Sequence, residues 1–188
     1  MMRAVAAAIM PLMLAAAAPA ASTYTIDTAH SDVTARVAVM GVSSRTARFP
    51  HISGTVRLPG GQADRMSLDV AIDARTLTAA DESIRKRLKG QQYFWVEKYP
   101  TIRFTSTSLT LSGARSGIIS GRLTARGVTK PVKLTVTFDK PPASLKPGET
   151  LTIDGQTKIN RRHFGMTAHS VVVGKHVTIK LKARLKPA

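Results

Sequence analysis

The chain contains no cysteine among its 188 residues. This excludes disulfide bonds, thiol catalysis and thiolate metal sites, so packing alone must stabilise the fold. Acidic residues are also scarce, with 11 Asp and Glu against 28 Lys and Arg, which leaves few carboxylate pairs for acid–base catalysis. Beyond residue 20, no run is apolar enough to span a bilayer.

Residues 1–20 have the composition of a secretory signal peptide. An apolar stretch rich in Ala, Leu and Met follows Arg3, and Ala18-Pro19-Ala20 fits the small-x-small rule for cleavage. We therefore predict cleavage after Ala20 or Ala21 and export to the periplasm. A transmembrane anchor is the alternative, but the stretch is short for the roughly 20 residues that span a bilayer, and it contains Pro11.

The mature part, 21–188, is strongly basic. Removing the leader takes away one cation and no acid, which lowers the formal net charge from +17 to +16, and about 168 residues remain, enough for one domain. A positive balance of this size favours nucleic acid, an anionic membrane surface or an acidic ligand as partner. Because the protein is expected to be exported, nucleic acid is the weakest candidate of these three, and we expect no nucleic-acid partner.

Apolar and polar residues alternate along most of the mature chain. The alternation is clearest in 33–39, 52–58, 66–72, 132–138 and 177–185. Turn signals rich in Gly and Pro separate these segments. Because alternation is typical of half-buried antiparallel strands, the sequence predicts an all-β fold of about eight or nine strands.

Residues 78–90 break the alternation and predict one short helix. Thr78 and Asp81 form a capping box, and Gly90 ends the segment. Ile84 and Leu88 make a single narrow apolar stripe, so the helix can cover a sheet but cannot form a core of its own.

The last predicted strand carries a basic face. Its cations alternate with apolar residues and are most simply its solvated side; they are Lys180, Lys182, Arg184 and Lys186. Attraction to anionic envelope lipids or to a phosphorylated ligand is the alternative. Salt screens exposed charges beyond about 8 Å, so this face can steer an encounter but supplies little affinity.

Catalytic and metal motifs are weak. Asp27, His30, Ser31 and Asp32 are close in sequence, but adjacent residues of a strand point to opposite faces, and we do not expect a catalytic relay from them. Three histidines near the C-terminus, separated by five and six residues, match no standard metal pattern: His163, His169 and His176. We therefore expect no enzyme, no metal and no cofactor.

Four segments carry a specific resemblance. They are YTIDTAHSDVTARV at 24–37, YFWVEKYPTIRF at 93–104, GRLTARGVTKPVKLTVTF at 121–138 and INRRHFGM at 159–166. In this order they resemble the successive motifs of the YceI-like family of periplasmic, lipocalin-like proteins. The resemblance implies an antiparallel β-barrel of about eight strands, crossed by one helix between strands, with an apolar tunnel for a long isoprenoid chain. It also makes a homodimer plausible.

The chain departs from the family pattern at two places. Val39-Met40-Gly41 replaces a His-Leu-Gly or His-Met-Gly sequence, and Gly174-Lys175-His176 replaces an acidic Gly-Asp-Glu sequence. Any polar role of the family's histidine is lost at Val39. The segment Gly174-Lys175-His176 is basic where the family is acidic.

The strand faces and the resemblance together predict a ligand site in the barrel interior. Its apolar members are Val37, Val39, Leu68, Val70, Phe94, Trp95, Phe104, Leu134, Phe138 and Phe164. An anionic head group would meet Arg161, Arg162 and His163, although a solvated turn is the simpler interpretation of these three residues. Burying ten carbons of a guest would contribute about 8 kcal/mol before the costs of binding, which favours a long apolar guest.

More than half of the aromatic rings of the chain lie in residues 91–104. This run either seals the barrel under the helix or lines the tunnel, and different rings can do each. We expect Phe104, within a strand, to line the tunnel and Trp95, just after the helix, to seal the core.

The sequence thus predicts a periplasmic carrier of a long-chain isoprenoid or similar amphiphile. An envelope stress-response or interaction protein that uses its basic surface is one alternative. An enzyme acting on a lipid-like substrate is the other.

Overall fold

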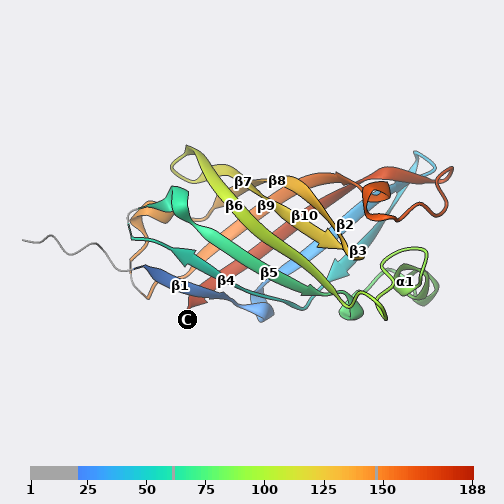
Figure 1. The fold of residues 1–188 in the computed structure, drawn as a ribbon, viewed down its shortest axis with the longest axis horizontal. Coiled ribbons are helices and arrows are strands. Elements are labelled where there is room, and N and C mark those ends of the chain that lie inside the picture. Colours follow the sequence, from blue (N-terminus) through green and yellow to red (C-terminus); the bar gives the residue numbers. More distant parts are fainter. Residues whose placement is uncertain (1–20, 61, 147) are drawn as a thin grey trace, which may run out of the picture.

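The computed structural model describes residues 21–188 except 61 and 147 (Figure 1). The predicted leader, 1–20, lies outside the described residues. The strands are β1 (Ser22–Ile26), β2 (Asp32–Val39), β3 (Ser43–Phe49), β4 (Ile52–Leu58), β5 (Ser67–Asp73), β6 (Thr101–Gly113), β7 (Ser116–Ala125), β8 (Val128–Phe138), β9 (Leu151–Asn160) and β10 (Val173–Pro187). The helices are α1 (Glu82–Lys89) and the 3-10 turns η1 (Thr28–His30), η2 (Ala63–Arg65), η3 (Ala74–Thr76), η4 (Pro142–Ser144) and η5 (Arg161–Phe164).

The strands form a closed, antiparallel, lipocalin-like barrel with eight strand positions around its wall. One edge of β10 pairs with β9, and the other edge pairs first with β2 and then with β1, which closes the barrel. β1 and β2 therefore occupy one strand position of the barrel, interrupted at η1. β3 and β4 occupy another, interrupted at Pro50-His51. The predicted all-β barrel is confirmed, and these interruptions raise the strand count to ten.

The two ends of the barrel differ. Figure 1 shows α1 at the same end of the barrel as the turn between β2 and β3 and the loop before β10, and the C-terminus at the other end. We call the first the helix end. Segment 90–100 also lies there, since it follows α1 directly and the N–H of Phe94 donates a hydrogen bond to the carbonyl of Leu88 at 2.9 Å. None of the helices in the described part is long and apolar enough to cross a membrane.

Strand alternation places the core inside the barrel. On β5, Leu68, Val70 and Ile72 are buried, whereas Asp69 on the opposite face forms an ion pair with Arg103 on the outer wall. Burying each such aliphatic side chain contributes about 1.5–3 kcal/mol.

Gly121 on β7 makes room for an aromatic ring inside the barrel. A Cβ atom built on Gly121 would lie 2.5 Å from Cζ of Phe104 and 2.6 Å from the carbonyl oxygen of Thr105. The ring of Phe104 can therefore lie close against the backbone of the next strand, because the residue there is a glycine.

The helix begins later than the sequence predicts. The carboxylate of Asp81 accepts a hydrogen bond from the N–H of Ile84 at 2.8 Å, so Asp81 is the N-cap. Thr78 instead exchanges two backbone hydrogen bonds with Arg48 of β3. Thr78 as the first capping residue was wrong, because a distant strand takes its backbone groups. The predicted end at Gly90 is confirmed.

Candidate functional site

Two apolar cavities lie on the inner side of the barrel wall. The first, the interior cavity, has a volume of about 70 Å³ and is lined by Val33, Leu68, Val70, Ile72, Phe104, Leu123, Val132, Leu134, Thr157, Ile179 and Leu181. The second, the mouth pocket, has a volume of about 290 Å³ at the helix end. Its lining is Ala35, Val37, Val39, Arg45, Thr46, Ala47, Ile84, Arg87, Leu88, Tyr93, Phe94, Arg161, Met166, His169, Val172, Val173 and Val177.

The linings of the two cavities follow the same strand faces. On β2, Val33 lines the interior cavity and Val37 lines the mouth pocket. On β10, Ile179 lines the interior cavity and Val177 lines the mouth pocket. Because alternate residues of a strand share one face, the apolar lining runs unbroken along β2 and, from Val177 inward, along β10.

The aromatic run divides between three places. Phe104 lines the interior cavity, whereas Tyr93 and Phe94 line the mouth pocket. The ring of Phe94 also packs edge-on against Phe49, with 5.4 Å between the ring centroids. Different rings of one short segment therefore contact different parts of the path.

Trp95 lies outside the lining of both cavities. Its ring packs edge-on against Tyr99, and Nζ of Lys98 lies 4.6 Å from its centroid, a cation–π arrangement. The backbone of Trp95 is left-handed, with φ of 49°, because the chain turns sharply between α1 and β6. This position does not match the predicted role of a core seal.

Arg161 is the buried cation of the mouth pocket. Only 3% of it is exposed, and its guanidinium donates hydrogen bonds to the backbone carbonyls of Met166, Val173 and Gly174. Burial lowers the pKa of Arg161 below its usual value. Carbonyl dipoles thus hold the charge of Arg161 beside an apolar pocket, where it also fixes the loop before β10.

The three predicted head-group residues do not meet in one place. Arg161 is buried in the mouth pocket, whereas Arg162 is exposed and donates a hydrogen bond to the carbonyl of Ser170. His163 lines a cleft on the outer wall and contacts Nδ2 of Asn160 at 3.1 Å. They diverge because η5 is a 3-10 turn, in which successive side chains point in directions about 120° apart.

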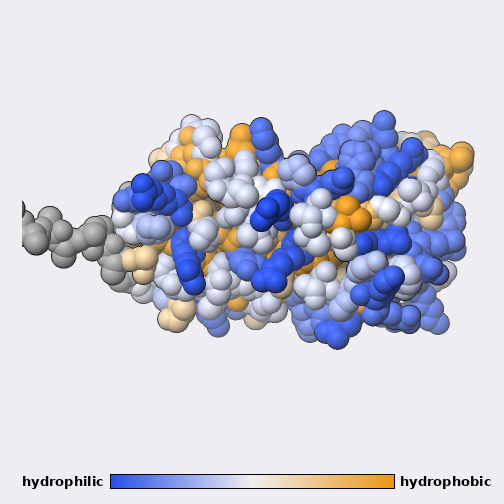
Figure 2. Space-filling view, in the orientation of Figure 1, coloured by the Kyte–Doolittle hydropathy of each residue, from blue (hydrophilic) through white to orange (hydrophobic). Residues whose placement is uncertain are grey.

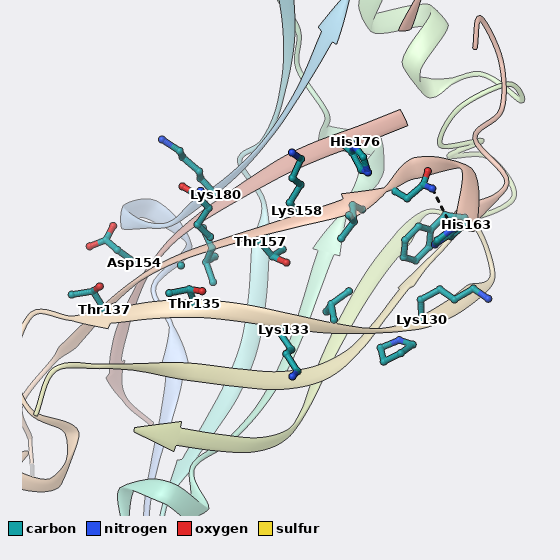
Figure 3. A pocket seen from close by; sticks show the side chains of 18 residues that line it. Lys130, Lys133, Thr135, Thr137, Asp154, Thr157, Lys158, His163, His176 and Lys180 are labelled. Carbon is teal, nitrogen blue, oxygen red and sulfur yellow. Dashed lines mark hydrogen bonds between the residues drawn. The ribbon is translucent and has the colours of Figure 1, made fainter. Parts of the chain in front are cut away.

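The outer cleft lies on the wall formed by β8, β9 and β10 and has a volume of about 1080 Å³ (Figure 3). We call it the basic cleft, since its lining includes Lys130, Lys133, Lys158, Lys180, His163 and His176. Asp154 is the one acid in that lining, and Phe164 lines its apolar part.

The remaining apolar prediction, Phe138, is buried in the core, where it pairs with Ile153, away from the lining of these cavities. Several lining residues were not predicted, including Tyr93 and Met166 of the mouth and Leu123, Ile179 and Leu181 of the interior. The signal for the last two was the alternation in 177–185, whose apolar face is the lining face.

The cluster near η1 brings together only one pair. Nδ1 of His30 lies 2.8 Å from Oδ2 of Asp27, and this hydrogen bond lowers the pKa of Asp27. Asp27 and His30 meet because a 3-10 turn places residues three apart on one side. The Oγ of Ser31 instead accepts a hydrogen bond from the N–H of Arg184, at 2.9 Å.

A closed barrel with an apolar interior that opens at one end is the architecture of a protein that can hold one slender apolar ligand. The chain belongs to the YceI-like family, since its residues 24–185 match the YceI-like domain. The resemblance seen in the four sequence motifs is confirmed.

Curated relatives and solved structures are similar over most of their length. A UPF0312 protein of Shewanella putrefaciens is 26% identical over 171 residues, which cover 90% of each chain. A UPF0312 protein of Pseudomonas putida is 26% identical over 156 residues, which cover 82% of this chain and 81% of that protein.

Burkholderia cenocepacia BcnA is similar with a TM-score of 0.75 and 24% identity, over 85% of this chain and 98% of BcnA. A domain from Saccharophagus degradans, described as polyisoprenoid binding, gives a TM-score of 0.66 and 14% identity, over 88% of this chain and 98% of that domain. At these identities the likeness to solved structures shows the fold alone.

Proposed function

We propose that the chain is a periplasmic binding or carrier protein for a long-chain isoprenoid or similar amphiphile. The apolar part of the guest occupies the path from the mouth pocket to the interior cavity. The observation that carries this proposal is the unbroken apolar lining along β2 and β10. The description of the Saccharophagus degradans domain as polyisoprenoid binding supports the same ligand class.

The size of the path agrees with a slender guest. The mouth pocket, at about 290 Å³, is near the lower end of the roughly 300–1,000 Å³ typical of ligand pockets. A longer chain would have to widen the interior cavity, and the ring of Phe104 is the largest side chain in that lining.

The test is mass spectrometry of organic extracts from the purified protein, with two matched variants. Ala35 lines the mouth pocket, and Ala38 is exposed on the opposite face of the same strand. We expect Ala35→Trp to fill the pocket and to lose the co-purified lipid, and Ala38→Trp to retain it. If wild type carries no lipid and binds no added isoprenyl alcohol, the proposed function is wrong.

Export is tested separately. We expect the protein in the periplasmic fraction, with its N-terminus at Ala21 or Ser22. A leader retained in the membrane fraction would contradict the periplasmic part of the proposal and leave the binding part intact.

A further inference from the structure

Strands β8 and β9 separate toward the helix end. β8 pairs with β7 along 128–137, and β9 pairs with β10 along 151–160. The ladder between β8 and β9, in contrast, joins only 135–138 with 153–156. Residues 128–134 and 157–160 therefore face each other without ladder pairing in the described structure, and η5, which contacts β8, bounds the gap.

At the gap, the basic cleft outside the barrel and the interior cavity share part of their lining. Val132, Thr157 and Leu181 line both the interior cavity and the basic cleft. Among the described residues, these side chains lie between the two spaces at a point where no β8–β9 ladder closes the wall.

The rim of the gap is cationic. Four lysines line the cleft: Lys130, Lys133, Lys158 and Lys180 (Figure 3). Within the described residues, none of these lysines lies within 4 Å of a carboxylate oxygen. Residues 155–188 contain no acid at all. Unpaired like charges around a concave surface raise the local positive potential and attract an anion.

We infer that the basic cleft binds the anionic head group, a phosphate or a pyrophosphate, of the amphiphile whose chain lies in the barrel. The inference rests on the proposed function. The chain passes between β8 and β9, past Val132 and Thr157, and the head group meets Lys130 and Lys158 on the two sides of the gap. Lysine ammonium groups bind phosphate as point charges and need no fixed geometry.

The test compares farnesol, farnesyl monophosphate and inorganic phosphate by isothermal titration calorimetry. We expect wild type to bind the phosphate ester more tightly than the alcohol, and this preference to shrink as salt is added. Replacing Lys130 and Lys158 with Gln should weaken binding of the phosphate ester about fivefold and leave the alcohol unchanged. The matched control replaces Lys86 and Lys186, two exposed lysines outside the cleft, and should change neither affinity.

Three results would overturn the inference. One is a Lys130→Gln/Lys158→Gln variant that binds the phosphate ester as wild type does, or that loses the alcohol equally. Another is inorganic phosphate binding as tightly as the phosphate ester, which would make the cleft a site for free anions. If wild type binds neither farnesyl compound, the proposed function fails, and this inference fails with it.

A second surface, at the helix end, is exposed and apolar. Met40, Val42, Val171 and Val172 are 71%, 93%, 99% and 38% exposed, and we call them the apolar tip. The N–H of Met40 donates a hydrogen bond to the carbonyl of Val172 at 2.7 Å, so the two loops lie side by side. Figure 2 shows apolar surface at this tip, where Figure 1 places the β2–β3 turn and the loop before β10.

The apolar tip is not explained by packing. Met40 adopts a left-handed backbone, with φ of 52°, which is uncommon for a residue other than glycine. Single exposed valines are ordinary, but a contiguous exposed apolar patch marks an interaction site. Val172 belongs both to this tip and to the lining of the mouth pocket, so the patch borders the opening of the barrel.

The charge around the apolar tip selects the partner. Residues 33–63 and 155–188, which supply both loops, contain no acid, and Arg45, Arg162 and Lys175 are exposed on them. Apolar side chains that project between cations are the pattern of a surface that enters the interface of an anionic bilayer. We propose that the apolar tip docks on anionic membranes and brings the mouth pocket to the lipid surface.

The test is flotation with vesicles of phosphatidylcholine alone or mixed with phosphatidylglycerol. We expect wild type to bind the mixed vesicles and to bind them less in high salt. Val42→Asn and Val171→Asn should each weaken this binding at least about threefold, because both lose apolar insertion. The control is Ile118→Asn, another exposed apolar residue, on β7 outside the tip, and it should bind as wild type does.

Wild type that does not float with the mixed vesicles would refute docking. So would an equal loss in Ile118→Asn, or full binding by both tip variants. Neither tip valine to be replaced lines the mouth pocket, so farnesol binding in solution should be unchanged in these variants. Failure of docking is therefore distinguishable from failure of the proposed function.

Discussion

Replacing Phe104 with Ala tests whether a guest reaches the interior cavity. The ring lines that cavity on one side and lies against the backbone of Gly121 on the other. Truncating a fully buried Phe costs about 3–5 kcal/mol. Because part of this ring already faces a cavity, we expect a smaller loss in the empty protein, about 2–3 kcal/mol.

A bound guest should increase this difference. At a free concentration of 100 times Kd, a ligand stabilises the folded state by about 2.7 kcal/mol. If the lost ring weakens binding tenfold, the variant gains about 1.4 kcal/mol less from the same guest. The difference in unfolding free energy between wild type and Phe104→Ala should then rise to about 4 kcal/mol in the loaded protein.

The assay is urea unfolding of delipidated protein, repeated after loading with a polyprenyl alcohol. Trp95→Ala is the control, since Trp95 lies outside both cavity linings. We expect it to cost about 1–2 kcal/mol through its contacts with Tyr99 and Lys98, with or without the guest. If the guest stabilises Phe104→Ala as strongly as wild type, the ring does not contact the guest, and the interior cavity is not part of the path.

Three further predictions follow from single contacts. Gly121→Ala places a Cβ atom 2.5 Å from the ring of Phe104, so it should cost about 1–3 kcal/mol in urea unfolding and reduce the bound lipid, and an unchanged midpoint would contradict the packing. Arg161→Met leaves three backbone carbonyls without their donor and should cost about 3 kcal/mol or more, whereas Arg161→Lys should be intermediate. The hydrogen bond from Arg103 lowers the pKa of Asp69 below 3.8, so the pair contributes stability above that pH and loses it as the pH falls through the lower folded-state pKa. Asp69→Asn should thus be less stable than wild type by about 0.5 kcal/mol at neutral pH and equal to it in acid, and a constant difference would contradict this pairing.

The strand faces could be predicted from sequence because alternation is a local property. The buried side of β5 and the lining side of β10 both follow from it directly. The start of α1 could not be predicted in the same way, since Thr78 has good local capping chemistry and is taken instead by Arg48, thirty residues earlier. The local preference of Thr78 for a helix N-cap is overridden because a distant strand forms two backbone hydrogen bonds with it.

The candidate site was harder to predict from the sequence, again because contacts between distant parts of the chain decide it. Residues 128–138 alternate as one continuous strand, and nothing in that pattern shows that pairing with β9 stops at Thr135. Adjacent cations at 161–163 suggested one cluster, but a 3-10 turn directs them to different places. Which side chains meet across a barrel depends on register and strand separation, which are nonlocal.

The contrast between the two ends of the barrel gives the path a direction. Away from the helix end, Phe138, Leu151 and Leu185 are each only 1% exposed and close the interior with core packing. The mouth pocket, the gap between β8 and β9, and the apolar tip all lie toward the helix end. A guest enters such a barrel from its open end, so the apolar terminus of the guest would point toward Phe138 at the closed end. Its polar end would stay near the cations, because a buried charge without a partner is costly and Phe138, Leu151 and Leu185 at the closed end are apolar.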